Sequence, residues 1–155
     1  MYTLFYIVMY DWNTGVWTNE DEFDSSFALE NAREVFDRLK ESLENICYTF
    51  PLVGFSWDAD TDVTPNGWQT AKIIANENGA KLAKFLLDIK NSCNTLNKDV
   101  NLRLIGHSLG ARVILSTLDN LNNNNEWNNK NFTIKSVNLL GAAIDNNEIS
   151  KISMI

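Results

Sequence analysis

The stretch VNLRLIGHSLGARVILSTL, residues 100–118, joins two apolar segments through a turn that holds one serine and two glycines. Residues 100–106 form a short run rich in branched side chains, which is typical of a buried strand. The segment from Gly110 to about Leu121 has the composition and length of a buried helix. The stretch therefore predicts a strand that passes directly into a helix.

Within this stretch, GHSLG at residues 106–110 matches the pattern G-x-S-x-G. The pattern requires a strand, a sharp turn and a helix, because the serine must be held out above the edge of the sheet. Glycines two residues on either side let the strand and the helix pass closely, since a Cβ there would collide. We expect Ser108 at the turn, with the amide of Leu109 at the positive end of the helix dipole.

Strand-like and helix-like segments alternate on both sides of this motif. Strands are expected over residues 2–10, 51–57 and 132–143, and amphipathic helices over residues 24–46 and 68–89. Gly79 weakens the middle of the second helix by about 1 kcal/mol, so one helix and two shorter pieces are both compatible with the sequence. The Asn-rich residues 122–131 are expected to be a solvated connection.

This alternation predicts an α/β fold, with a mostly parallel sheet of about four strands and helices on both faces, because long crossovers join parallel neighbours. A chain of 155 residues with 45% apolar residues suits a single domain over residues 1–155.

The net charge and composition of the chain argue against several kinds of partner and location. The formal net charge of −7 argues against nucleic acid or an anionic membrane surface as a partner, because phosphates would be repelled. The apolar opening is too short to span a bilayer and lacks the features of an export signal, so a cytoplasmic protein is expected. Cys47 lies among apolar neighbours and is expected to be a buried free thiol rather than half of a disulfide.

Four blocks together resemble a lipase/esterase-like branch of the α/β-hydrolase superfamily: VGFSWDADTD (53–62), WQTAKIIANENGAKLAKFLLD (68–88), LRLIGHSLGARVILSTL (102–118) and LLGAAID (139–145). The resemblance implies Ser108 as a nucleophile towards small-molecule or lipid esters, without a metal or organic cofactor. It implies an oxyanion hole formed by the amide of Leu109 and a second N–H from the loop after the first strand, which we assign to Trp12. Such enzymes usually carry His-Gly in that loop, where this chain has Tyr10-Asp11.

The acid and the base of a triad follow the serine in this superfamily, in that order. Asp145 is the candidate acid, and a solvated loop residue or helix cap is the alternative for it. The only histidine, His107, directly precedes Ser108 in a strand, so its side chain should point away from the serine hydroxyl. We interpret His107 as a local packing or hydrogen-bonding residue and expect the hydrolase to be truncated at its C-terminus and weak or inactive alone.

Other interpretations stay open at this level. The chain could be a non-catalytic binding or interaction module, or an enzyme that takes its histidine from another subunit. The motif could also be an ordinary glycine-rich turn or an anion-binding helix start. Asp58, Asp60 and Asp62 imitate the beginning of a calcium loop but lack its later glycine and glutamate, so no metal is expected. An exposed edge of the last strand makes self-association a further expectation.

Overall fold

A computed structural model describes residues 3–10, 25–48, 51–57, 64–95, 100–127 and 132–144. Strands and helices alternate along these residues, as the sequence pattern predicts. The elements are β1 (Thr3–Tyr10), α1 (Ser25–Asn45), β2 (Leu52–Ser56), α2 (Pro65–Thr95), β3 (Val100–His107), α3 (Leu109–Asn122), the short 3₁₀ helix η1 (Asn125–Trp127) and β4 (Phe132–Leu140).

The strands form one four-stranded sheet in the order β2-β1-β3-β4. Each neighbouring pair is parallel, and β1 and β3 are the two inner strands. Because the strands are parallel, their carboxyl ends lie at one edge of the sheet, where β3 passes into α3. The predicted α/β class with a parallel sheet is confirmed.

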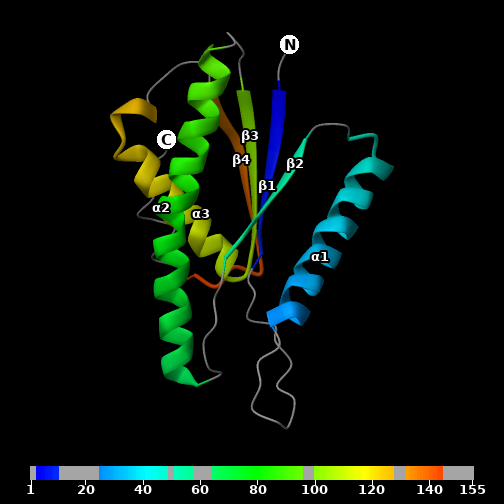
Figure 1. Ribbon diagram of the computed structural model, residues 1–155, viewed down its shortest axis with the longest axis vertical. Helices are drawn as coiled ribbons and strands as arrows, with labels where there is room; N and C mark the ends of the chain where they lie inside the picture. Colours follow the sequence, from blue (N-terminus) through cyan, green and yellow to red (C-terminus); the bar gives the residue numbers. More distant parts are fainter. Residues whose placement is uncertain are drawn as a thin grey trace.

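Helices lie on both faces of this sheet, with α1 on one side and α2 and α3 on the other (Figure 1). Along β3, Val100, Leu102, Leu104 and Gly106 are buried, the residues between them are half-buried, and only the last residue of the strand is exposed. The buried face of β3 is the one that packs against α3, since a Cβ added to Gly106 would collide with the side chain of Ile114 in that helix. The main core therefore lies between the sheet and the α2–α3 layer.

The α2 helix is one continuous helix of 31 residues, so the alternative of two shorter pieces is wrong. Gly79 lies where α2 contacts α3, and a Cβ there would stand 2.4 Å from Cβ of Ser116 and 2.9 Å from its carbonyl carbon. Ser116 Oγ donates across the helices to the carbonyl of Asn76 at 2.6 Å. Thr117 Oγ1 shares its proton between the carbonyl of Val113 in its own helix, at 2.8 Å, and that of Gly79 in α2, at 3.2 Å. The glycine lets two helices touch at their backbones, and packing outweighs its low helix propensity.

The α1 helix ends in a Schellman motif around Cys47, whose φ is 61°. The amide of Tyr48 donates to the carbonyl of Leu43, and the amide of Cys47 donates to that of Glu44. Both cysteines are free thiols, but Cys47 is exposed, so the prediction of its burial is wrong. The local sequence is apolar, but the turn that ends the helix directs this residue to solvent.

The Asn-rich connection after α3 is more structured than the sequence predicts. The 3₁₀ helix η1 forms within it, and Trp127 is only 6% exposed. Its ring packs edge-on against Phe132 at the start of β4, with the ring centroids 5.2 Å apart. One aromatic side chain thus anchors a connection that was expected to be wholly solvated.

Candidate functional site

Ser108 occupies the single turn residue between β3 and α3, at the carboxyl edge of the sheet. Its φ is 52° and its ψ is −122°, a combination that residues with a Cβ rarely adopt. Ser108 is the N-cap of α3, but its side chain makes no capping hydrogen bond. Its hydroxyl is therefore not used to satisfy the first turn of the helix, although serine is a preferred residue for that task.

Gly106 explains how the chain can turn so sharply. A Cβ at this position would lie 2.7 Å from Cδ1 of Ile114, 2.8 Å from the carbonyl oxygen of Gly110 and 2.9 Å from the amide nitrogen of Ala111. Two of these three atoms belong to the backbone, which cannot move aside cheaply. The strand and the first turn of α3 are in contact at this point, and Gly110 is buried there as well.

The backbone of Ser108 is also bonded to the end of β4. Its amide donates to the carbonyl of Leu140 at 3.0 Å. Its carbonyl accepts from the amide of Ala111 within the helix, and from the amide of Ala143 beyond β4, both at 3.1 Å. Both polar groups of the strained residue are thus paired, and one strand plus the segment after it hold the turn in place.

The strand before that segment ends at Leu140, three residues earlier than the sequence predicts. Gly141 has a φ of 51°, which breaks the extended conformation and turns the chain back towards Ser108. Arg112, only 8% exposed on α3, donates from Nη2 to the carbonyl of Ala143 at 3.2 Å. The segment 141–144 is therefore held by hydrogen bonds rather than by a sheet ladder.

The amide of Leu109 is the first in α3, and the first turn of a helix has no intrahelical acceptor for such an amide. The dipole of α3 places partial positive charge at the same point. The side chain of Leu109 is fully buried and anchors this turn to the core. A backbone N–H donor therefore stands directly after Ser108, at the N-terminal end of α3.

His107 is exposed at the end of β3 and pairs with Leu140 of β4. Its ring lies at the segment after β4, with Nε2 3.8 Å from the position that a Cβ would take on Gly141. Successive residues of a strand point to opposite faces, so His107 leaves the sheet on the face away from buried Gly106. This placement agrees with a local packing role and does not by itself assign a catalytic one.

Trp12, Asp145 and the acidic residues 58, 60 and 62 lie outside the described residues. The sheet nevertheless shows which strands lead to the first two. Met9 of β1, three residues before Trp12 in the sequence, pairs with Gly106, so the end of β1 lies beside the serine turn. Asp145 follows two residues after Ala143, whose amide is bonded to Ser108. Within the described parts of the chain, no group of three or more histidine, cysteine or acidic residues could hold a metal ion.

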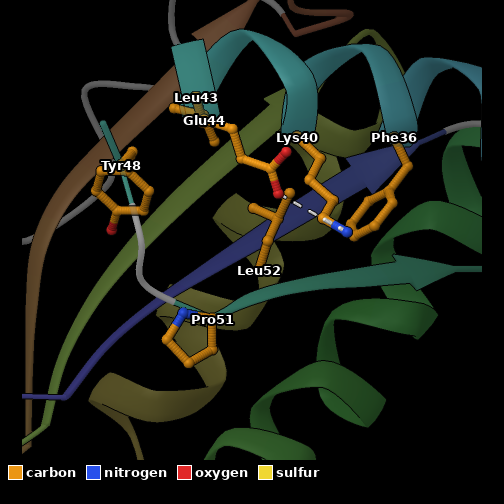
Figure 2. Close-up of a pocket in the computed structure, with 7 residues that line it drawn as sticks. All are labelled: Phe36, Lys40, Leu43, Glu44, Tyr48, Pro51 and Leu52. Atoms are coloured by element: carbon orange, nitrogen blue, oxygen red, sulfur yellow. Dashed lines mark ion pairs between the residues drawn. The ribbon is translucent and has the colours of Figure 1, made fainter. Parts of the chain in front are cut away.

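A pocket of about 510 Å³ lies between the end of α1 and the start of β2 (Figure 2). Its apolar part includes Phe36, Leu43 and Leu52, and Lys40 and Glu44 form an ion pair at its rim. Leu52 begins β2, so this pocket is at the amino edge of the parallel sheet, whereas Ser108 is at the carboxyl edge. The pocket is not part of the serine site.

Two residues of the serine site are not found by reading the motif alone. Arg112 is the one charged residue in the apolar first half of α3, four residues after Ser108, and this placement is the sequence signal that points to it. Gly141 follows an apolar strand, and the sequence pattern does not mark its turn, because apolar residues continue on both sides.

A model of the family described as "Protein of unknown function (DUF726)" matches residues 48–155, more than two thirds of the chain, so the protein belongs to this family. The match includes β2, β3, α3 and β4, and thus the whole described part of the serine site. No curated protein and no solved structure matches the chain. Among the residues that the structure describes, no helix is both long and apolar enough to cross a membrane.

Proposed function

We propose that this DUF726 protein is a serine hydrolase that acts on carboxylic esters through Ser108. The observation that carries the proposal is the backbone of Ser108, which holds a φ of 52° between a parallel strand and a helix. Such a conformation costs on the order of 1–3 kcal/mol and persists where the surroundings impose it, commonly at functional sites. The sequence resemblance to lipase/esterase-like α/β-hydrolases supports the same assignment.

In this reaction, Oγ of Ser108 attacks the ester carbonyl carbon, and the carbonyl π electrons move onto the oxygen. The amide of Leu109 donates to that oxyanion, and the N-terminal end of α3 stabilises its charge. Collapse of the intermediate re-forms the carbonyl and breaks the bond to the alcohol oxygen, which takes up the proton that Oγ of Ser108 has lost. Water then attacks the acyl carbon by the same route, one of its protons returns to Oγ as the acyl–Oγ bond breaks, and the carboxylic acid leaves, so the steps need no metal or organic cofactor.

The remaining roles are assigned by placement along the chain. We assign the second oxyanion donor to Trp12, because β1 ends beside Gly106. We assign the triad-type acid to Asp145, because the chain reaches it directly from the segment bonded to Ser108. The described residues contain no assigned base, and a triad hydrolase without its base loses around six orders of magnitude in turnover. We therefore expect this chain alone to be a weak catalyst.

The test is covalent labelling with a fluorophosphonate probe, which reacts with activated serines without requiring turnover. Because no base is assigned among the described residues, we expect labelling to be slow: on long incubation the wild-type protein should gain one label on the peptide that contains Ser108, and the Ser108→Ala variant none there. Ser92→Ala, which removes an exposed hydroxyl on α2, is the matched control and should label like the wild type. Equal labelling of the wild type and Ser108→Ala would contradict the proposal that the protein is a serine hydrolase.

A second candidate function is a non-catalytic interaction module that associates through the outer strand of the sheet. Within the described sheet β4 is an outer strand, and Leu140 at its end is 53% exposed. Outer strands present unpaired backbone groups that can pair with another chain. Sedimentation over a wide concentration range should then show reversible dimers that Leu140→Asp weakens. Ile73→Asp, at an apolar residue of α2 that is 57% exposed, is the control, and a monomer at all concentrations contradicts this alternative.

A further inference from the structure

We propose that Arg112 is a positioning residue that fastens the segment 141–144 against the backbone of Ser108 and thereby sets the reactivity of this serine. The inference rests on the proposed hydrolase function. It adds a role for a charged side chain that the G-x-S-x-G pattern does not include.

The side chain of Arg112 is directed to the right place by its position in α3. It lies four residues after Ser108, which puts it on the same face of the helix one turn later. Long side chains in a helix lean towards its N-terminus, so the guanidinium reaches back to the turn that holds the serine. There Nη2 donates to the carbonyl of Ala143 at 3.2 Å.

Ala143 is bonded on both sides. Its carbonyl accepts from Arg112, and its amide donates to the carbonyl of Ser108. Ser108, the first turn of α3, Arg112 and Ala143 therefore form a closed ring of covalent and hydrogen bonds. A displacement of Ala143 must break one of the two hydrogen bonds or move the strained serine itself.

The segment needs such an anchor because it has no sheet ladder of its own. β4 ends at Leu140, and Gly141 turns the chain with a φ of 51°. A charged donor in a buried place makes a stronger hydrogen bond than a neutral one, and Arg112 is only 8% exposed. Because Asp145 comes two residues after Ala143, the same anchor also fixes where the chain that carries the candidate acid begins.

The experiment measures the rate of fluorophosphonate labelling at Ser108 together with hydrogen exchange of the amides in 141–144. Arg112→Met removes the donor but keeps an apolar stem of similar length. We expect up to about a 100-fold slower labelling, the loss that a misplacement of about 1 Å can cause, and faster exchange at Ala143. Arg112→Lys, which restores a charged donor, should recover most of the labelling rate.

Arg103→Met is the matched control. Arg103 is a half-buried arginine on β3 that donates to Ser136 Oγ, away from the serine turn, so its loss should leave both readouts near wild-type values. If circular dichroism shows that Arg112→Met does not fold, Arg112→Lys provides the test. The proposal then requires that hydrogen exchange at the amide of Ala143 stays slow in Arg112→Lys, and fast exchange overturns it.

The outcomes separate the two proposals. Suppose first that Ser108 of the wild type is labelled. If Arg112→Met is then labelled at the same rate, or if Arg112→Lys does not recover the wild-type rate, the role of Arg112 is overturned and the hydrolase proposal stands. A wild type that does not label overturns the hydrolase proposal and, with it, the effect on reactivity. In that case unchanged exchange at Ala143 in Arg112→Met overturns the anchor as well, and faster exchange supports the anchor alone.

Discussion

At the scale of single residues, the serine turn depends on Gly106, which has no side chain. The space that a side chain would take is occupied by the backbone of Gly110 and Ala111 and by the end of Ile114. The side chain of Ile114 can change rotamer, but the first turn of α3 can move only if Ser108 moves with it. A side chain at position 106 should therefore lower the stability of the protein and also displace Ser108.

Gly106→Ala is therefore expected to lower the free energy of unfolding by about 1–3 kcal/mol, the usual cost of overpacking a filled site. Urea denaturation measures this change. Gly54→Ala on β2 is the control, because the nearest atom to its Cβ is in the ring of Phe36, at 3.2 Å, and a side chain can give way. An equal or larger loss for Gly54→Ala would contradict the contact at the turn.

At the scale of elements, the periodic patterns predicted α1 and the four strands closely. Apolar spacing reports which face of a segment is buried, and β3 shows this directly, with a buried residue at every second position. The end of α1, by contrast, is decided by the αL conformation of Cys47, a residue that has no special preference for it. Hydrophobic patterns locate an element better than its termini, as α2 shows: it runs from Pro65 to Thr95, beyond the predicted 68–89 at both ends.

At Gly79 in α2, helix propensity and packing against α3 favour different residues. In isolation, Gly79→Ala should favour the helix by about 1 kcal/mol. In the protein its Cβ would stand 2.4 Å from Cβ of Ser116, so we expect the substitution to destabilise the fold by about 1–3 kcal/mol.

The neighbouring Ala80→Gly tests the propensity term alone, because Ala80 is exposed on the same helix. Thermal or urea denaturation should show a loss of about 1 kcal/mol for this variant. A stabilising effect of Gly79→Ala would mean that α2 and α3 do not approach as closely as described.

At the scale of the whole molecule, Lys90 couples stability to pH. It is one of the largest fully buried side chains, and desolvation by burial lowers its pKa from 10.5, although the carboxylate of Glu126 partly opposes this shift. The unfolded chain then binds more protons than the folded one between the lowered pKa and 10.5, so this group's contribution to stability increases as the pH rises through that window.

Lys90→Met should remove this slope and be neutral or stabilising by about 1 kcal/mol at neutral pH, because an apolar residue of similar length replaces a desolvated charge. Urea denaturation at a series of pH values from neutral to 10.5 gives the comparison. Lys84→Met, an exposed lysine on the same helix, should keep the wild-type slope. A slope that survives Lys90→Met would show that other groups produce it.

The sequence by itself determined the α/β class, the succession of strands and helices and the position of Ser108 at a strand–helix junction. These properties follow from local periodicity and from glycines that only a tight turn requires. Tertiary structure alone decided that α2 stays one helix through Gly79, that Trp127 is buried and that Arg112 reaches Ala143. The first and the last depend on contacts between segments far apart in the chain, and the burial of Trp127 depends on its packing against Phe132 at the start of β4. Hydrogen bonds and packing of these kinds leave no periodic pattern in the sequence of either partner.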